Sequence, residues 1–530
     1  MIFSSIPFLY YFLPMVLLLY YIVPEKYKNG ALLLSSLVFY AWGEPKAVFL
    51  MVISILVSYI CGRMIGSGRA PRLFFLLGVG VSLAFLLYFK YMGFFVSNFS
   101  AVMGISIPIL KVGLPVGISF YTFQLVSYLI DVYRGTVAAQ KNLVDLAAYV
   151  VMFPQLIAGP IVRYADIALQ LRKREHSYDQ MAQGIKRFMI GMAKKVLIAD
   201  ALGGFCSQFN ELFASYQMAA QASAVSQMSV LYVWLYGISF MLQIYFDFSG
   251  YSDMAIGLGK MFGFTFMENF DYPYISRSIT EFWRRWHISL GSWFRDYVYI
   301  PLGGNRVSRG RWLLNILTVW MLTGFWHGAA WNFVLWGLYF AVLLLIEKLC
   351  LKDFLKKHGI FSHLYMLFFV MIGFMMFHAA SISEGVAQIS ALFGYGRSGA
   401  IPLVSAESLY YLRSYFVTFA VAVIGATPVA KKLYESIWVK VEGIMVHMSD
   451  YIFAHKKKVF WDAQKESVLH HKIDAVVDNN SDEFSPVWNQ EKRCFFLRQL
   501  VEAAACLVLL LLMTAYFVDG TFSPFLYFRF

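Results

Sequence analysis

Charged residues are scarce in this sequence of 530 residues: Asp, Glu, Lys and Arg together supply 14% of it. Soluble domains carry about 25%. Hydrophobic residues supply 59%, and the mean hydropathy is +0.61. A chain of this composition has too few polar groups to cover its surface in water, which excludes an ordinary soluble domain. The sequence therefore predicts an integral membrane protein.

Cysteine is also rare, and its spacing does not indicate metal binding. The sequence has five cysteines, none of them in a CxxC pair: Cys61, Cys206, Cys350, Cys494 and Cys506. This pattern argues against a disulfide framework and against a zinc site, so we expect mostly buried, apolar thiols. We expect no bound metal and no tightly bound cofactor.

Acidic residues are outnumbered by basic ones, 31 to 44, which gives a net charge of +13. The basic residues gather in short clusters between apolar runs, as in membrane proteins that keep their positive loops in the cytoplasm. We therefore expect no nucleic-acid partner. The clusters predict cytoplasmic loops at 63–72, 163–187, 276–311 and 347–357. Segment 201–228 contains no Lys or Arg and is expected outside, together with the N-terminus.

Ten apolar runs are long enough, or nearly so, to cross about 30 Å of hydrocarbon. They are 6–24, 30–43, 46–62, 73–95, 113–131, 187–204, 229–250, 363–380, 409–428 and 497–517. The first run has no basic leader or cleavage site and is expected to be a span rather than a signal peptide. The runs predict an all-α polytopic membrane protein with roughly 10–12 transmembrane helices plus re-entrant and interfacial helices.

The predicted spans divide the chain into three regions. We expect N-terminal transmembrane helices in 1–135, a core with re-entrant segments in 136–346, and C-terminal transmembrane helices in 347–530. The last region includes a polar segment, 455–493, which predicts a cytoplasmic loop. Within the core, the run 145–162 has basic flanks and is interrupted by prolines, so it predicts a re-entrant segment rather than a full crossing.

A second run, 312–346, also has basic flanks, and as one helix it would extend about 50 Å. Two shorter helices meeting near Gly324 or Gly328 would return to the same side of the membrane. That arrangement would place His327 near the apex, deep in the membrane. A single, strongly tilted helix is the alternative.

His327 is the first candidate for chemistry, because ionisable residues inside lipid are costly and are usually functional. It lies in the segment TGFWHGAAWNF, with Trp326 and Trp331 beside it. A neutral imidazole in an apolar pocket is a usable general base near neutral pH. The alternative is a histidine that only hydrogen-bonds a neighbouring helix, and this segment alone does not decide between the two.

His287 is the second candidate. Around it, aromatic and apolar residues recur at spacings of three and four, namely Trp283, Trp286, Leu290, Trp293 and Tyr297. This stripe predicts an amphipathic helix and favours an interfacial helix on the cytoplasmic leaflet. His287 borders the apolar face, however, and can point inward.

Two acidic residues, Asp247 and Asp253, lie at or near the end of a predicted span. They are expected either to pair with the arginines of 276–311, a structural role, or to order a polar channel. The sequence favours neither alternative.

Several long segments together resemble the membrane-bound O-acyltransferase (MBOAT) family, in the branch that acetylates bacterial extracellular polysaccharides. The central ones are FDFSGYSDMAIGLGKMFGF, ENFDYPYISRSITEFWRRWHISLGSWFRDYVYIPLGGNR and LTGFWHGAAWNFVLWG. Further similar segments are FPQLIAGPIVRY at 153–164, GIKRFMIGMAKKVLIAD at 184–200 and the ending SPFLYFRF at 523–530. The resemblance covers most of the chain, but the polar stretch 455–493 is longer than the family leads us to expect.

The resemblance implies a ring of helices around a thin, funnelled centre, which donor and acceptor approach from opposite sides. The near-invariant membrane histidine of the family falls on His327, and the second histidine falls on His287. The implied donor is cytoplasmic acetyl-CoA, and the implied acceptor is alginate or another exopolysaccharide. The implied partners are an extracytoplasmic acetyltransferase and the polysaccharide synthesis machinery, at a bacterial cytoplasmic (inner) membrane. Peptidoglycan O-acetylation and teichoic acid D-alanylation are the alternatives within the family.

In this interpretation His327 deprotonates the acceptor hydroxyl or carries the acetyl group itself. An oxyanion on the thioester carbonyl needs hydrogen-bond donors, such as an indole N–H or the Asn332 amide. We predict supporting or channel roles for Trp283, Trp326, Trp331, Asn332, Asp247 and Asp253. Donor phosphates are expected to bind to Arg284, Arg285 and Arg295, although cytoplasmic loops are rich in arginine in any case.

Two readings from other classes compete with an enzyme. A transporter or lipid flippase predicts inverted repeats and charges paired at mid-membrane, and the sequence shows no repeat. A non-catalytic scaffold for a polysaccharide synthase predicts that changes at His327 and His287 leave acetylation intact.

Overall fold

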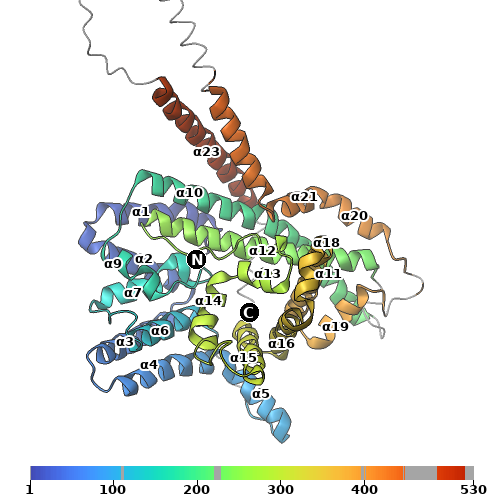
Figure 1. Cartoon of the computed structure of the whole chain (residues 1–530), viewed down its shortest axis with the longest axis horizontal. Coiled ribbons are helices and arrows are strands. Elements are labelled where there is room, and N and C mark those ends of the chain that lie inside the picture. Colours follow the sequence, from blue (N-terminus) through green and yellow to red (C-terminus); the bar gives the residue numbers. More distant parts are fainter. Residues whose placement is uncertain are drawn as a thin grey trace, which may run out of the picture. The chain divides into compact units, whose positions relative to one another are not determined.

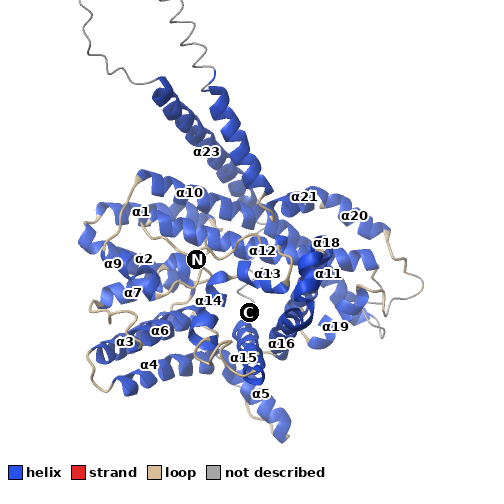
Figure 2. Cartoon of the chain, viewed as in Figure 1, coloured by secondary structure: helices blue, strands red, loops and turns tan. Residues whose placement is uncertain are grey.

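A computed structural model describes residues 2–108, 113–219, 228–395, 399, 401–445, 447 and 486–519. Within these ranges the regular elements are helices, and strand-like pairing is limited to one bridge between Phe270 and Trp286 (Figure 2). This arrangement confirms the predicted all-α class. Most of the predicted loop 455–493, and the ending 523–530, lie outside the described residues.

The N-terminal helices form a layer in which α3, α4 and α6 pack side by side (Figure 1). Helix α4 passes into α5 through a π-helical turn, η3, without a break in the helical path. The elements are η1 (Pro7–Phe12), α1 (Leu13–Ile22), η2 (Glu25–Tyr27), α2 (Lys28–Gly43), α3 (Ala47–Gly66), α4 (Pro71–Leu86), η3 (Leu87–Tyr91), α5 (Met92–Met103) and α6 (Ile118–Tyr133).

The middle of the chain contains the longest buried helix, α12 (Val230–Met261), which packs along α10 (Tyr178–Ala193). Glycines make this contact close: a Cβ atom on Gly191 would lie 2.5 Å from the carbonyl oxygen of Gly250. Small residues of this kind let helix backbones approach each other in membranes. The other elements here are α7 (Leu143–Val151), α8 (Phe153–Leu156), α9 (Tyr164–Arg172), η4 (Lys194–Ala199), α11 (Asp200–Ala219), η6 (Pro273–Ile275), α13 (Ile279–Arg285), α14 (Ile288–Phe294), η7 (Arg295–Tyr299), α15 (Arg309–His327) and α16 (Trp331–Ile346).

The C-terminal elements are η8 (Glu347–Leu351), α17 (Lys352–Lys357), α18 (Gly359–His378), α19 (Ile382–Ala391), α20 (Ala406–Ser414), α21 (Phe416–Gly425) and α23 (Pro486–Val518). The chain separates into two compact units. One comprises 1–426 with 513–530 and contains all of the candidate site residues, and the other comprises 427–512.

Six helices of the described residues are long and apolar enough to cross a membrane, and the bent pair α20–α21 would make a seventh. They are Ala47–Gly66, Pro71–Met103, Val230–Met261, Trp331–Lys357, Gly359–His378 and Cys494–Val518. The predicted spans 30–43 and 113–131 correspond to shorter helices, α2 and α6, which have 16 residues each. The predicted span 187–204 covers the end of α10, all of η4 and the start of α11. The helices support a multi-pass membrane protein.

Both predicted interruptions of the helical pattern are present. The segment 145–162 is broken at Met152, the residue after α7, and the short helix α8, with Pro154 in its first turn, follows inside a wholly buried stretch. The segment 312–346 forms two helices, α15 and α16, that end and begin on either side of Gly328 and pack against each other (Figure 1). The prediction of a two-helix arrangement in place of one tilted helix is confirmed.

Candidate functional site

A cavity of about 250 Å³ opens between α13, α14, α15 and α16. Its wall is largely aromatic, with indole rings from Trp283, Trp286 and Trp320. Two cations, Arg295 and Lys348, lie at one part of this lining, and His287 also contributes to it. The cavity therefore combines an apolar lining, a titratable group and positive charge, which are the features of a site for a ligand with an apolar arm and an anionic head.

His287 occupies a turn that the helical pattern did not predict. Its backbone is left-handed, with φ 46° and ψ 53°, and it separates α13 from α14. The preceding residue, Trp286, instead pairs with Phe270 in the one strand-like bridge described above. The prediction of one continuous amphipathic helix through 283–297 is therefore wrong. A side chain other than glycine in this conformation is strained, and such strain is common at functional sites.

Buried hydrogen bonds to Asn269 hold the His287 ring. The Oδ1 atom of Asn269 accepts from the Ser289 backbone N–H at 3.2 Å and from the Ser289 hydroxyl at 2.9 Å. That oxygen lies 3.2 Å from His287 Nδ1, so the proton of the neutral ring is placed on Nδ1. The Nε2 atom has no hydrogen-bond partner among the described residues and is left as a proton acceptor.

His327 is the last residue of α15, and its side chain is buried. Its ring lies 5.1 Å from that of Trp336 and 5.2 Å from that of Phe377, measured between ring centroids. The Trp326 ring is 5.0 Å from His327 and 6.1 Å from His287. The two predicted histidines thus both lie close to one indole, that of Trp326.

Close packing of two helices fixes the position of His327. A Cβ atom on Gly324 would overlap the carbonyl oxygen of Phe333, and one on Gly337 would overlap that of Trp320. Only glycine therefore fits at these two positions of the α15–α16 hairpin. The hairpin places the end of α15 about 27 Å along its axis from Arg309, at a rise of 1.5 Å per residue.

Trp331 and Asn332, which were predicted as possible oxyanion donors, use their N–H groups to anchor this hairpin. The Trp331 indole donates to Asn98 Oδ1 at 2.9 Å, and its ring is half-exposed. The Asn332 amide donates to the Ala379 carbonyl at 3.2 Å. By contrast, the Trp283 Nε1 has no hydrogen-bond partner among the described residues and belongs to the cavity lining.

Asp247 and Asp253 pair with cations that the sequence reading did not assign to them. Lys195 lies 2.9 Å from Asp247, while Arg187 and Lys194 lie 2.6 and 2.7 Å from Asp253. The arginines of 276–311, which one of the two open alternatives named as partners, are not among these cations. These ion pairs join α12 to α10 and η4, and none of their members belongs to the cavity lining.

The three predicted donor-binding arginines separate in the structure. Arg285 pairs with Asp271 at 2.8 Å and with Glu281 at 3.1 Å, and Arg284 is exposed. Only Arg295 belongs to the cavity lining. It also lines an adjoining hollow of about 570 Å³, together with Tyr299, Asn305, Arg309, Trp312 and Lys348. The motif reading missed Arg309 and Lys348, although both lie in basic clusters identified from the sequence.

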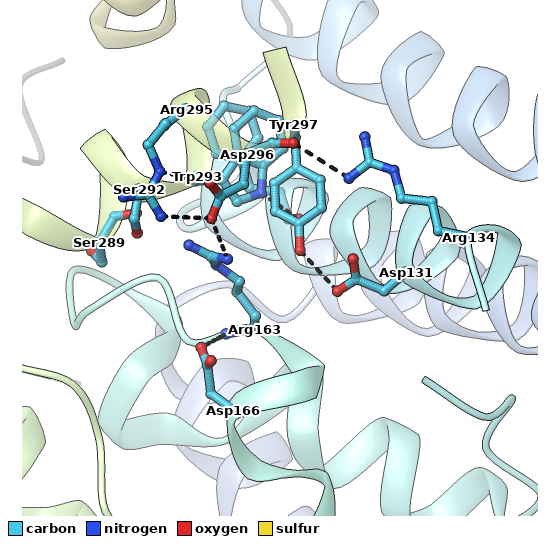
Figure 3. Close-up of polar contacts among 11 residues, drawn as sticks. Asp131, Arg134, Arg163, Asp166, Ser289, Ser292, Trp293, Arg295, Asp296 and Tyr297 are labelled. Carbon is cyan, nitrogen blue, oxygen red and sulfur yellow. Dashed lines mark hydrogen bonds and ion pairs between the residues drawn. The ribbon is translucent and has the colours of Figure 1, made fainter. Parts of the chain in front are cut away.

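A network of polar contacts holds Arg295 and its π-helical turn, η7 (Figure 3). Arg295 Nε lies 2.7 Å from Asp296, and Arg163 reaches the same carboxylate at 2.8 Å. Burial raises the pKa of Asp296, but hydrogen bonds from the two guanidinium groups outweigh it and lower the pKa overall. The next residue, Tyr297, donates to Asp131 at 2.8 Å. The turn is thereby attached to α6 and to the start of α9.

Glu347 connects the end of α16 to the start of α13. Its buried carboxylate accepts hydrogen bonds from the Ile279 N–H at 2.5 Å, the Thr280 N–H at 2.9 Å and the Thr280 hydroxyl at 2.6 Å. These N–H groups begin α13, so a carboxylate that follows α16 caps the helix that leads to His287.

Lys90 is a further residue that motif reasoning missed. Its Nζ donates to the Trp326 carbonyl at 2.6 Å and lies 3.3 Å from the His327 carbonyl. A signal was present in the sequence, because Lys90 is the one charged residue of the apolar run 73–95.

Comparisons with known proteins identify the family of this chain. A family model described as the membrane-bound O-acyltransferase family matches residues 138–385, a range that includes both histidines. The chain is 43% identical over 409 residues to the "Probable alginate O-acetylase" of Azotobacter vinelandii, covering 75% of this chain and 79% of that protein. It is 33% identical over 433 residues to the peptidoglycan O-acetyltransferase of Helicobacter pylori, covering 74% and 80%. The teichoic acid D-alanyltransferase of Bacillus subtilis is 31% identical over 239 residues, covering 43% and 57%.

Proposed function

Because this chain belongs to the membrane-bound O-acyltransferase family, we propose that it moves acetyl groups from cytoplasmic acetyl-CoA across the bilayer to an extracellular polysaccharide. The chain is a multi-pass membrane acyltransferase, and its relatives support O-acetyl transfer. The observation that carries the proposal is the pair of buried imidazoles, His287 and His327, that both lie close to the Trp326 ring. His287 also lines a cavity whose lining includes two cations.

The cationic hollow supports a role for this end of the cavity in donor binding. In the proposal, Arg295, Arg309 and Lys348 hold the phosphates of coenzyme A, because guanidinium and ammonium groups make charge-assisted hydrogen bonds to phosphate. The pantetheine arm then lies along the indole rings of Trp283 and Trp320. In this arrangement the thioester lies between those rings and His287, which lines the same cavity.

Acetyl transfer needs a base, an oxyanion donor and a leaving group. His327 takes the proton of the acceptor hydroxyl, and the hydroxyl oxygen attacks the thioester carbonyl. The Trp283 indole N–H is suited to stabilise the resulting oxyanion. Collapse of the intermediate breaks the C–S bond and forms the ester, and the coenzyme A thiolate recovers the proton. In the alternative route His327 first carries the acetyl group and then yields it to the acceptor.

The proposal also names an acceptor polysaccharide and the membrane in which the protein lies. Similarity to a protein named for alginate supports an alginate-like exopolysaccharide, while the peptidoglycan and teichoic acid relatives supply the alternatives. The basic clusters support cytoplasmic loops in a bacterial inner membrane and an N-terminus outside. A partner acetyltransferase outside the membrane, and the division into 1–135, 136–346 and 347–530, belong to the same proposal.

The test measures ester-linked acetate on secreted and wall polysaccharide in cells that express wild type or His327→Ala at matched membrane levels. We expect acetate to disappear in His327→Ala. The control is His358→Ala, which removes an exposed imidazole away from the cavity lining and should leave acetate unchanged. Retained acetate in inserted His327→Ala protein would refute the catalytic role and favour a scaffold or a transporter. Covalent acetyl on His327, detected by mass spectrometry, would select the two-step route.

A further inference from the structure

Lys90 lies in a π-helical turn, η3, between α4 and α5. A π-helical turn shifts the side chains of a helix out of their usual register, and such turns are frequent at functional sites. Here the turn directs two successive residues, Lys90 and Tyr91, toward the end of α15. Lys90 is partly buried, and Tyr91 is buried.

The two side chains satisfy the last carbonyl groups of α15. Tyr91 donates its hydroxyl to the Phe325 carbonyl at 3.0 Å, and Lys90 Nζ donates to the Trp326 carbonyl at 2.6 Å. The same Nζ is 3.3 Å from the His327 carbonyl and 3.3 Å from the Ser119 hydroxyl oxygen. Carbonyls at the C-terminal end of a helix have no partner within that helix, and they carry partial negative charge.

The chain following α15 does not provide such a cap. Gly328 is extended, with φ −165° and ψ 151°, and α16 begins three residues later. The ammonium group makes no ion pair with a carboxylate among the described residues, and it lies 5.8 Å from the centre of the Trp326 ring. A neutral donor would satisfy a carbonyl at lower desolvation cost than an ammonium group inside a membrane. An ammonium group at this cost points to a cap whose position matters for function.

We propose that Lys90 is a positioning residue for acetyl transfer, which fixes the last turn of α15 and with it the His327 imidazole and the Trp326 indole. This inference rests on the proposed function. The ammonium group binds the backbone carbonyls of both Trp326 and His327, so its removal frees both of these side chains together. A misplacement of a reacting group by about 1 Å can lower a rate by about 100-fold.

The activity test uses the purified full chain in nanodiscs with acetyl-CoA and a polysaccharide acceptor. We expect Lys90→Met to lower kcat by about 100-fold with the KM for acetyl-CoA nearly unchanged, because the cationic hollow is lined by other residues. Lys90→Arg keeps a charged donor and should recover part of the loss. Tyr91→Phe removes one hydroxyl without changing shape and should lower kcat by a smaller factor.

The matched control is Tyr88→Phe, the same change in the same π-helical turn, at an exposed tyrosine. It should behave as wild type. A folded Lys90→Met protein with the kcat of wild type would overturn the inference, as would equal kcat values for Tyr91→Phe and Tyr88→Phe. A rise in KM alone would also overturn it, since positioning acts on kcat.

A second measurement separates this inference from the proposed function. Hydrogen–deuterium exchange at the amides of 323–328 does not depend on any substrate. We expect faster exchange there in Lys90→Met than in Tyr88→Phe, because the last turn of α15 loses its cap. Unchanged exchange would overturn the positioning role even in an active enzyme. If exchange is faster in Lys90→Met but the wild type itself transfers no acetyl, the proposed function is overturned and the structural part of the inference stays supported.

Discussion

Replacement of Asn269 by alanine tests how the site holds its second histidine. The Oδ1 atom of Asn269 accepts from Ser289 and His287, and its Nδ2 donates to Ser252 at 3.1 Å. Asn269→Ala leaves the Ser289 N–H and the His287 Nδ1–H without this acceptor in a buried environment. Each orphaned buried donor costs about 1–3 kcal/mol, so the loss of stability should be about 2–6 kcal/mol.

The same change should reduce activity by more than unfolding explains. A His287 ring without a fixed Nδ1–H is free to change tautomer and orientation, and loss of such an orienting bond can cost about 10–100-fold in the comparable case of metal-bound histidines. Thermal unfolding in nanodiscs gives the stability change, and acetyl transfer at a temperature where the variant is folded gives the activity. Asn269→Asp keeps an oxygen at Oδ1 and serves as the control, with a smaller effect on both.

One result would refute the reasoning. If folded Asn269→Ala transfers acetyl at the rate of wild type, the His287 ring either keeps its orientation without Asn269 or takes no part in the reaction. Replacement of His287 by alanine then distinguishes the two, because only the second explanation leaves His287→Ala active.

Two other predictions concern the donor and the hairpin. Arg295→Ala combined with Lys348→Ala should raise the KM for acetyl-CoA by about tenfold with little change in kcat, since these cations contribute binding that is equal in ground and transition states; an unchanged KM in steady-state kinetics would remove them from the donor site. Gly324→Ala should lower stability by about 1–3 kcal/mol, because its Cβ atom overlaps the Phe333 carbonyl oxygen. Gly310→Ala, at a position in the same helix with no heavy atom within 4 Å of an added Cβ, is its control in thermal unfolding.

The sequence predicted those parts of the site that depend on local pattern. Basic flanks and a length of about 50 Å predicted two helices in 312–346 with His327 where they meet, and left one tilted helix as the alternative. The positions of Gly324 and Gly328 also indicated where the backbone would bend, because glycine permits close approach.

The parts that failed depend on contacts between distant segments. The apolar spacing around His287 continues through the residue where the helix breaks, and the break arises from pairing of Trp286 with Phe270, which no periodicity records. The partners of Asp253 come from α10 and η4, about 60 residues away in the chain. Arg187 ends a basic cluster that indicates orientation, and Lys194 lies inside the predicted span 187–204, so neither pattern names a carboxylate partner. The role of Asn269 is visible only in its buried hydrogen bonds, and no sequence pattern predicts it.

The cap that Glu347 places on α13 has a mechanical consequence. The carboxylate follows the helix that returns from His327, and it binds the first turn of the helix that leads to His287. The α15–α16 hairpin, which carries His327, is therefore joined directly to α13, which leads to His287, so the two imidazoles belong to one rigid unit. We expect their separation to remain constant through a catalytic cycle, so that ligands enter and leave by rotation of the indole side chains while this unit stays rigid.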